Sequence, residues 1–154
     1  MYKKILVPLD GSELAECILP HVKEIAKSCA VKEVILLDVV EPFPTLGWVN
    51  QKNEQLVNWH NAQMKAAEEY LQKIQAQLTS EGINVTSEVV GILEDKVAET
   101  IINFAKQKGV NVIAIATHGR TGSIRRWVFG SVADRILRSS HLPVLMVRPD
   151  RVEK

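Results

Sequence analysis

The stretch from position 116 to 132 holds residue types that are suited to binding an anion. It follows an apolar run and leads into a helical pattern, and its glycines allow the backbone to approach a ligand closely. Gly130 and Ser131 stand where that helix would begin, and the free N–H groups and dipole of a helix N-terminus favour negative charge. Three arginines would supply cations nearby: Arg120, Arg125 and Arg126. The stretch therefore predicts a phosphate site.

A second explanation of the same stretch needs no ligand. Ser131 and Asp134, three residues apart, match the capping box, in which two side chains satisfy the first N–H groups of a helix. Arginines are mostly exposed and solvated, and glycines are common in loops that follow strands. Residues 116–132 taken alone leave both explanations open.

Acidic residues and a histidine lie at the predicted ends of strands. Asp10 can accept a hydrogen bond from a ribose hydroxyl or help to hold a phosphate-bound Mg²⁺, or it can favour the turn and the start of the next helix. We favour the ligand role, because ligands of open parallel sheets bind beyond the carboxyl ends of the strands. For Asp38 and Glu41 we expect turn and surface roles. His118, beside Gly119, is a candidate ligand contact without an evident catalytic partner.

Several motifs of catalysis and of nucleotide binding are missing from the sequence. It contains no G-x-x-x-x-G-K-[ST] phosphate loop and no G-x-G-x-x-G after the first strand. It has no G-x-S-x-G nucleophile elbow and no metal-ligand spacing of Cys and His. The sequence thus offers a place to hold a ligand and little with which to transform it.

Five short apolar runs and four helical patterns would position these residues. The runs are residues 4–8, 34–37 with 39–40, 85–90, 112–116 and 144–147. Continuous apolar runs are typical of strands covered on both faces, as in parallel sheets. The helical patterns are Leu14 to Ile25 after a Ser12 cap, with a kink expected at Pro20; Ala67 to Leu78, ending before Gly82; Val97 to Ala105, ending at Gly109; and Val132 to Leu137. This alternation predicts an α/β fold with helices on both faces of the sheet.

Composition and charge narrow the class of protein. The 154 residues, of which 46% are hydrophobic and 24% charged, fit one domain over residues 1–154. A net charge of +1 gives no reason to expect nucleic acid or a membrane surface as a partner.

No apolar stretch approaches the roughly 20 residues of a membrane span, and we expect no signal peptide. Cys17 and Cys29 would lie about 18 Å apart along one helix, too far for a disulfide. We therefore expect a reduced, cytoplasmic protein.

Several segments together resemble the universal stress protein family along nearly the whole chain. Lys4–Ser12 is similar to the opening strand and loop of that family. Residues 116–122 and 130–137 are similar to its glycine loop and last helix, and Pro143–Val147 to its closing strand. The resemblance implies an open, parallel, five-stranded Rossmann-like sheet of order 3-2-1-4-5. It also implies a homodimer, often joined through the last strand, and an apolar edge strand such as Val144–Val147 invites such pairing.

The glycine loop both matches and departs from the family's ATP-binding members. Those members carry Gly, two residues, Gly, nine residues, and then Gly with Ser or Thr. Here Gly119 matches the second glycine, and Gly130 with Ser131 matches the closing pair. Ala116 replaces the first glycine, and ten residues rather than nine separate Gly119 from Gly130. The extra residue can bulge outward and leave both anchors in place, or it can shift the arginines.

The resemblance to the ATP-binding members implies a role for each residue of the site. Pro8, Leu9 and Asp10 would flank the adenosine of ATP or a related adenine nucleotide, and Val39 would meet the adenine. The phosphates and ribose would be enclosed by Gly119, Arg120, Gly130, Ser131 and Val132. The predicted nucleotide-binding set is completed by Ala116, His118 and Gly122. Mg²⁺ would be held mainly by the phosphates and by water.

Three functions are compatible with these residues. We expect a stress-associated regulatory protein that binds ATP and signals through a homodimer to a partner protein that the sequence does not name. One alternative is a nucleotide-independent dimeric interaction protein, which the altered glycine loop favours. The other is an enzyme that slowly hydrolyses ATP or modifies itself, with Thr121, Ser123 or Ser131 as the acceptor. The proline- and aromatic-bearing segment from Pro42 to Trp48 can cover a nucleotide or pack over helix ends, and we favour packing.

Overall fold

The computed structural model describes residues 1–41, 54–92, 94, 96–119 and 129–150. Strands and helices alternate along these residues in the order β1 (Lys4–Pro8), α1 (Glu13–Glu16), α2 (Leu19–Ser28), β2 (Glu33–Val40), α3 (Glu54–Ser80), β3 (Val85–Gly91), α4 (Val97–Gln107), β4 (Val112–Ala116), α5 (Ser131–Ser139) and β5 (Val144–Val147). The five expected strands are all present within a residue of their predicted bounds. The expected α/β fold is confirmed.

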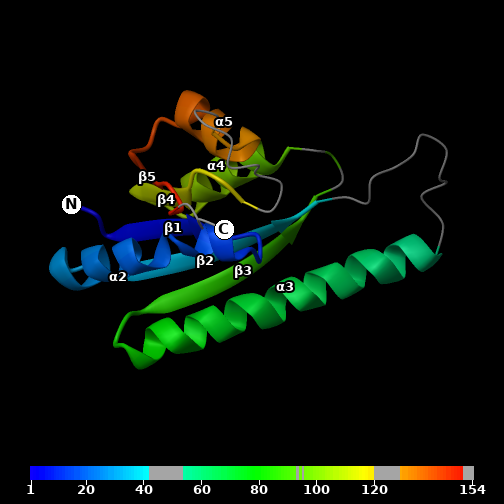
Figure 1. Ribbon diagram of the computed structural model, residues 1–154, viewed down its shortest axis with the longest axis horizontal. Helices are drawn as coiled ribbons and strands as arrows, with labels where there is room; N and C mark the ends of the chain where they lie inside the picture. Colours follow the sequence, from blue (N-terminus) through cyan, green and yellow to red (C-terminus); the bar gives the residue numbers. More distant parts are fainter. Residues whose placement is uncertain (42–53, 93, 95, 120–128, 151–154) are drawn as a thin grey trace.

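The strands form a parallel sheet of order β3-β2-β1-β4-β5 (Figure 1). This is the order that the family resemblance implies. The continuous apolar runs belong to strands that are covered on both faces, and β4 is buried at every residue. The edge strands differ, since Val85 is the only buried residue of β3 and all four residues of β5 are only half-buried.

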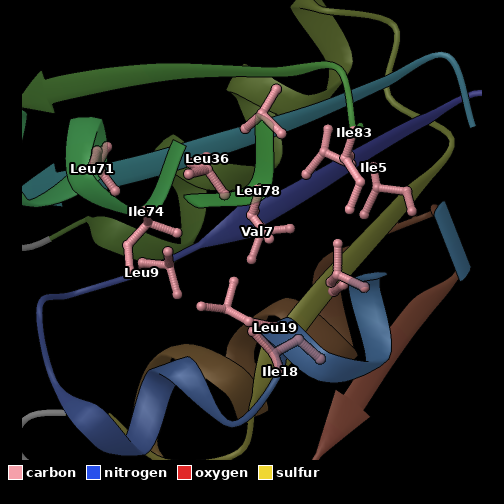
Figure 2. Packing of buried hydrophobic residues seen from close by; sticks show 14 of the residues in the cluster. Ile5, Val7, Leu9, Ile18, Leu19, Leu36, Leu71, Ile74, Leu78 and Ile83 are labelled. Carbon is pink, nitrogen blue, oxygen red and sulfur yellow. The ribbon is translucent and has the colours of Figure 1, made fainter. Parts of the chain in front are cut away.

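Helices α1, α2 and α3 cover one face of the sheet, and α4 and α5 cover the other (Figure 1). Successive strand residues point to opposite faces, so Ile5 and Val7 join one hydrophobic cluster while Leu6 joins the other. The cluster under α2 and α3 is shown in Figure 2 and includes Val7, Leu36, Ile18, Leu71 and Leu78. The cluster under α4 and α5 includes Ile35, Ile113, Ile101, Phe104 and Ile136.

The first helical pattern folds into two helices rather than one kinked helix. Ser12 caps α1 as expected, because its Oγ atom accepts a hydrogen bond from the N–H of Ala15 at 3.2 Å. This short helix ends at Glu16, and α2 begins at Leu19 with Pro20 in its first turn. Proline is tolerated there, since the first N–H groups of a helix have no intrahelical partner. The chain therefore begins a second helix at Leu19, just before Pro20, and the single helix kinked at Pro20 is not formed.

The other helices end where the glycines predict. Gly82 and Gly109 adopt φ angles of +83° and +65°, a region that glycine enters without strain. The buried residues of α3 are the expected Ala67, Leu71, Ile74 and Leu78. In α5 the expected apolar face is only partly correct, because Leu137 is 49% exposed.

The N-terminal half of α3 extends past the carboxyl ends of the strands (Figure 1). None of its residues before Ala67 is buried, and Trp59 is 37% exposed. The segment from Pro42 to Trp48, for which packing over helix ends is expected, lies outside the described residues.

Candidate functional site

The residues that follow β1 and β4 lie side by side at the carboxyl edge of the sheet. These two strands are neighbours, and the chain leaves them in opposite directions, β1 toward β2 and β4 toward β5. The position between them is thus the point where the strand order reverses, which is where open α/β sheets bind ligands. The candidate residues Asp10 and Gly119 meet here.

Asp10 is held by the turn that starts α1. Its Oδ1 atom accepts hydrogen bonds from the N–H of Ser12 at 3.0 Å and from the Ser12 hydroxyl at 2.6 Å. The turn-forming role considered for Asp10 is therefore real. Its Oδ2 atom lies toward the loop after β4, at 2.3 Å from the position that a Cβ of Gly119 would occupy. Only glycine at position 119 allows this approach without a shift of the carboxylate.

Gly130 brings the N-terminus of α5 back to the end of β4. Its N–H donates to the carbonyl oxygen of Thr117 at 2.7 Å, and a Cβ on Gly130 would lie 3.0 Å from that oxygen. Gly130 is the N-cap residue of α5, so Ser131 is the first residue of the helix. Ser131 is exposed and Val132 half-buried.

The capping box considered for Ser131 and Asp134 is wrong. The N-cap is Gly130, which has no side chain to cap the helix. The Asp134 carboxylate instead accepts from the guanidinium of Arg138 at 3.0 and 3.1 Å, one turn further along the helix. The first turn of α5 therefore starts without the reciprocal side-chain cap that would have explained Ser131 by helix stability alone.

The remaining predicted residues lie at or near the same edge, with different exposure. Pro8 and Leu9 are buried, and the Leu9 N–H donates to the Leu37 carbonyl at 2.8 Å. Ala116 is 5% exposed at the end of β4, and Val39 is half-buried on the face that α4 and α5 cover. His118 is also 5% exposed, and its Nδ1 atom lies 2.9 Å from the Thr117 hydroxyl.

Part of the predicted site lies outside the described residues. This applies to Arg120 and Gly122, to the other two arginines of the stretch, Arg125 and Arg126, and to the acceptor candidates Thr121 and Ser123.

Tyr70 brings together two acidic residues that sequence analysis did not assign to the site, Glu16 and Asp38, and it also lies near Asp10. The Tyr70 hydroxyl of α3 donates to Glu16 Oε1 of α1 at 3.0 Å. Burial raises the pKa of Tyr70, and the negative charges of Glu16, Asp10 and Asp38 raise it further. Asp38, for which a turn or surface role was expected, is 5% exposed within β2. The position of Asp38 between Leu37 and Val39, inside an apolar run, was the sequence signal that could have predicted its burial. No spacing in the sequence predicts the contact between Tyr70 and Glu16.

The described residues at this edge are rich in carboxylates, but they do not form a metal site. Within residues 1–41, 54–92, 94, 96–119 and 129–150, no group of three or more His, Cys, Asp and Glu side chains is arranged to hold a metal ion. The same residues include no helix with the length and apolarity that crossing a membrane requires.

Comparison with known proteins assigns the chain to a family. The model of the Universal stress protein family matches residues 1–148. Universal stress protein MJ0531 of Methanocaldococcus jannaschii is 31% identical over 153 residues, which cover 99% of this chain and 86% of that protein. Universal stress protein MJ0577 of the same organism is 34% identical over 161 residues, covering 96% of each.

Solved structures agree with the sequence comparisons. The structure of MJ0577 superposes with a TM-score of 0.78 at 32% identity, covering 98% of this chain and 99% of that one. A more distant universal stress protein, solved in complex with cAMP, shares the fold with a TM-score of 0.58 at 15% identity, covering 97% of this chain and 98% of that one. This chain therefore belongs to the universal stress protein family.

Proposed function

We propose that this protein is a cytoplasmic regulatory protein that binds ATP or a related adenine nucleotide where β1 and β4 end. The observation that carries this proposal is the arrangement of a hydrogen-bond acceptor and of hydrogen-bond donors on opposite sides of the carboxyl edge of the sheet. Asp10 presents a carboxylate on one side, and the N-terminus of α5 presents backbone N–H groups on the other. A nucleotide has the complementary polarity, because its ribose and adenine carry hydrogen-bond donors and its phosphates are anionic.

Each end of the nucleotide would meet a different group of residues. Asp10, Pro8 and Leu9 would flank the adenosine, with Val39 toward the adenine. The phosphates would lie over Gly119, Gly130, Ser131 and Val132, where the helix dipole favours negative charge. Asp10, Glu16 and Asp38 would repel phosphates, which supports this orientation over the reverse one. Mg²⁺ would be held by phosphate oxygens and water, since the described residues lack a metal-binding cluster.

The family supports nucleotide binding in general terms. A universal stress protein of the same fold has been solved in complex with cAMP. We therefore propose an adenine nucleotide as the ligand class and ATP as the first ligand to test. Binding without turnover is the simpler proposal, because the sequence contains none of the catalytic motifs considered above.

We also propose a homodimer that pairs through β5. All four residues of this edge strand are half-buried, and among the described residues one side of its backbone has no neighbouring strand. Apolar edge strands favour pairing with a second chain. A nucleotide-independent interaction protein is the second candidate function, favoured by Ala116 and by the ten-residue separation of Gly119 from Gly130.

Thermal unfolding with and without Mg-ATP tests the proposal. A ligand that binds only the folded protein stabilises it by about 2.7 kcal/mol at a hundredfold excess over its Kd. We expect a saturable rise in Tm for the wild type and none for Gly130→Glu, which places bulk and negative charge at the phosphate end. Gln72→Glu, an exposed position of α3, adds the same charge away from the site and should respond like the wild type. Absence of a shift in the wild type would instead favour the nucleotide-independent function.

A further inference from the structure

A hydrogen bond between two helices lies near Asp10, at the end of the site that is proposed to bind the adenosine. The Tyr70 hydroxyl in α3 donates to Glu16 Oε1 in α1 at 3.0 Å, although the two residues are 54 positions apart. Tyr70 packs partly buried against the hydrophobic cluster of this face. The bond therefore joins the long helix α3 to the short helix that directly follows Asp10.

Helix α1 needs such external support because it is very short. It contains four residues, from Glu13 to Glu16, and the next residue, Cys17, already ends it. A single helical turn is unstable alone, since few hydrogen bonds offset the loss of conformational freedom. Its first turn is held by Ser12, which binds both Ala15 and Asp10. Its last residue is held by Tyr70.

The environment of Tyr70 keeps its hydroxyl a hydrogen-bond donor. Burial and the nearby carboxylates of Glu16, Asp10 and Asp38 all raise the pKa of the phenol. A phenol is protonated at neutral pH in any case, since its ordinary pKa is about 10. The raised pKa keeps Tyr70 protonated at alkaline pH as well, and its hydroxyl donates to Glu16. A bond from a neutral donor to a carboxylate is stronger than a bond between two neutral groups.

We propose that Tyr70 is a positioning residue of the nucleotide site, which acts through Glu16 and α1 to hold Asp10 in the orientation that receives the nucleoside. This inference rests on the proposed nucleotide binding. In this role Tyr70 acts through its contact with Glu16 and not through a contact with the ligand. It fixes the far end of the turn that starts at Asp10, and so it determines how firmly the Asp10 carboxylate stays beside Gly119.

The affinity for Mg-ATP, measured by isothermal titration calorimetry, tests this role with three substitutions. Tyr70→Phe removes only the hydroxyl, and Glu16→Ala removes the acceptor; we expect each to weaken binding roughly fivefold. Glu16→Gln keeps an oxygen that can accept from Tyr70, and it should bind within about twofold of the wild type. If Glu16 mattered only through repulsion of phosphates, Glu16→Ala and Glu16→Gln would both bind more tightly, and the proposal would be overturned.

A double-mutant cycle shows whether Tyr70 acts through Asp10. In an Asp10→Asn background, Tyr70→Phe should cause no further loss of affinity, because the carboxylate that it positions is already gone. Lys23→Gln is the matched control, since it removes a contact of α2 beyond the other end of α3, the 2.6 Å ion pair with Glu81, which follows Ser80. It should lower the thermal stability and leave the affinity unchanged.

The outcomes separate this inference from the proposed function. A wild type that does not bind Mg-ATP overturns both. A wild type that binds, with Tyr70→Phe binding equally well, overturns only the role of Tyr70. An equal loss in the wild-type and Asp10→Asn backgrounds also overturns it, because Tyr70 would then act by general loosening. Thermal melts of every variant confirm that the compared proteins are folded.

Discussion

The Asp10 carboxylate occupies the space beside Gly119 that any larger residue would need. The Oδ2 atom lies 2.3 Å from the ideal Cβ position of Gly119, and the Oδ1 atom of the same carboxylate is bound to Ser12. The loop after β4 can therefore pass the end of β1 without displacing this carboxylate only if residue 119 is glycine. The residues that follow the two strands are in contact through this pair.

Gly119→Ala should destabilise the protein through this contact. The methyl group forces the Asp10 side chain away and breaks its bonds to Ser12, at a cost of about 1–3 kcal/mol, measured by urea unfolding. In an Asp10→Ala background, Gly119→Ala should cost less stability than it does in the wild type, because the carboxylate that collides with the methyl group is gone. An equal cost of Gly119→Ala in the wild-type and Asp10→Ala backgrounds would show that the two residues are not in contact.

Alkaline unfolding should depend on Tyr70. Its pKa is raised in the folded protein, so the unfolded chain loses the phenolic proton first, above the ordinary tyrosine value of about 10. Stability from this group is complete below that pH and falls as the pH rises further, because the unfolded state then binds fewer protons. Tyr70→Phe should flatten this decline, as followed by urea unfolding at several alkaline pH values. The chain has only two tyrosines, and Tyr2→Phe serves as the control.

The proposed dimer should depend on the backbone of β5. Pro143 and Val147 direct their carbonyl groups to β4, where they accept from Ile113 and Thr117. In a parallel strand alternate residues bond to the same neighbour, so the N–H of Met146 points to the open edge. Met146→Pro removes that donor and should give monomers in sedimentation equilibrium. Met146→Ala loses the side chain but keeps the N–H, and it should remain dimeric. Monomers in both variants would place the interface in the side chain rather than in strand pairing.

Two leucines on helices test the distinction between core and surface. Leu71 of α3 is fully buried between the helix and the sheet, so Leu71→Ala should cost about 2–5 kcal/mol by removing packed atoms and leaving a cavity. Leu137 of α5 is 49% exposed, and Leu137→Ala should change the stability by about 0.5 kcal/mol or less in the monomer. Chemical denaturation of the two variants gives both values, and a large loss in Leu137→Ala would show that this residue is covered in solution.

Much of the fold could be predicted because its signals are local. Residues 112–116 form a continuous apolar run since their strand is covered on both faces, and this requires no knowledge of which strand lies beside it. Gly82 and Gly109 end helices because they adopt positive φ without strain. The position of Asp10 at a strand end likewise follows from the order of residues along the chain. The sequence by itself thus determined the elements, the parallel class of the sheet and the edge at which to search for a ligand.

Only the tertiary structure decided which side chains meet there. Tyr70 and Glu16 are 54 residues apart, and their bond depends on how α3 packs against α1. Asp38 is buried on the face of β2 that α1, α2 and α3 cover. Ser131 does not cap α5, because Gly130 occupies the N-cap position and donates its N–H to Thr117. Such contacts arise from the packing of elements that are distant in the chain, which no periodicity or spacing records. For that reason the location of the candidate site could be predicted from the sequence, and the geometry of its residues could not.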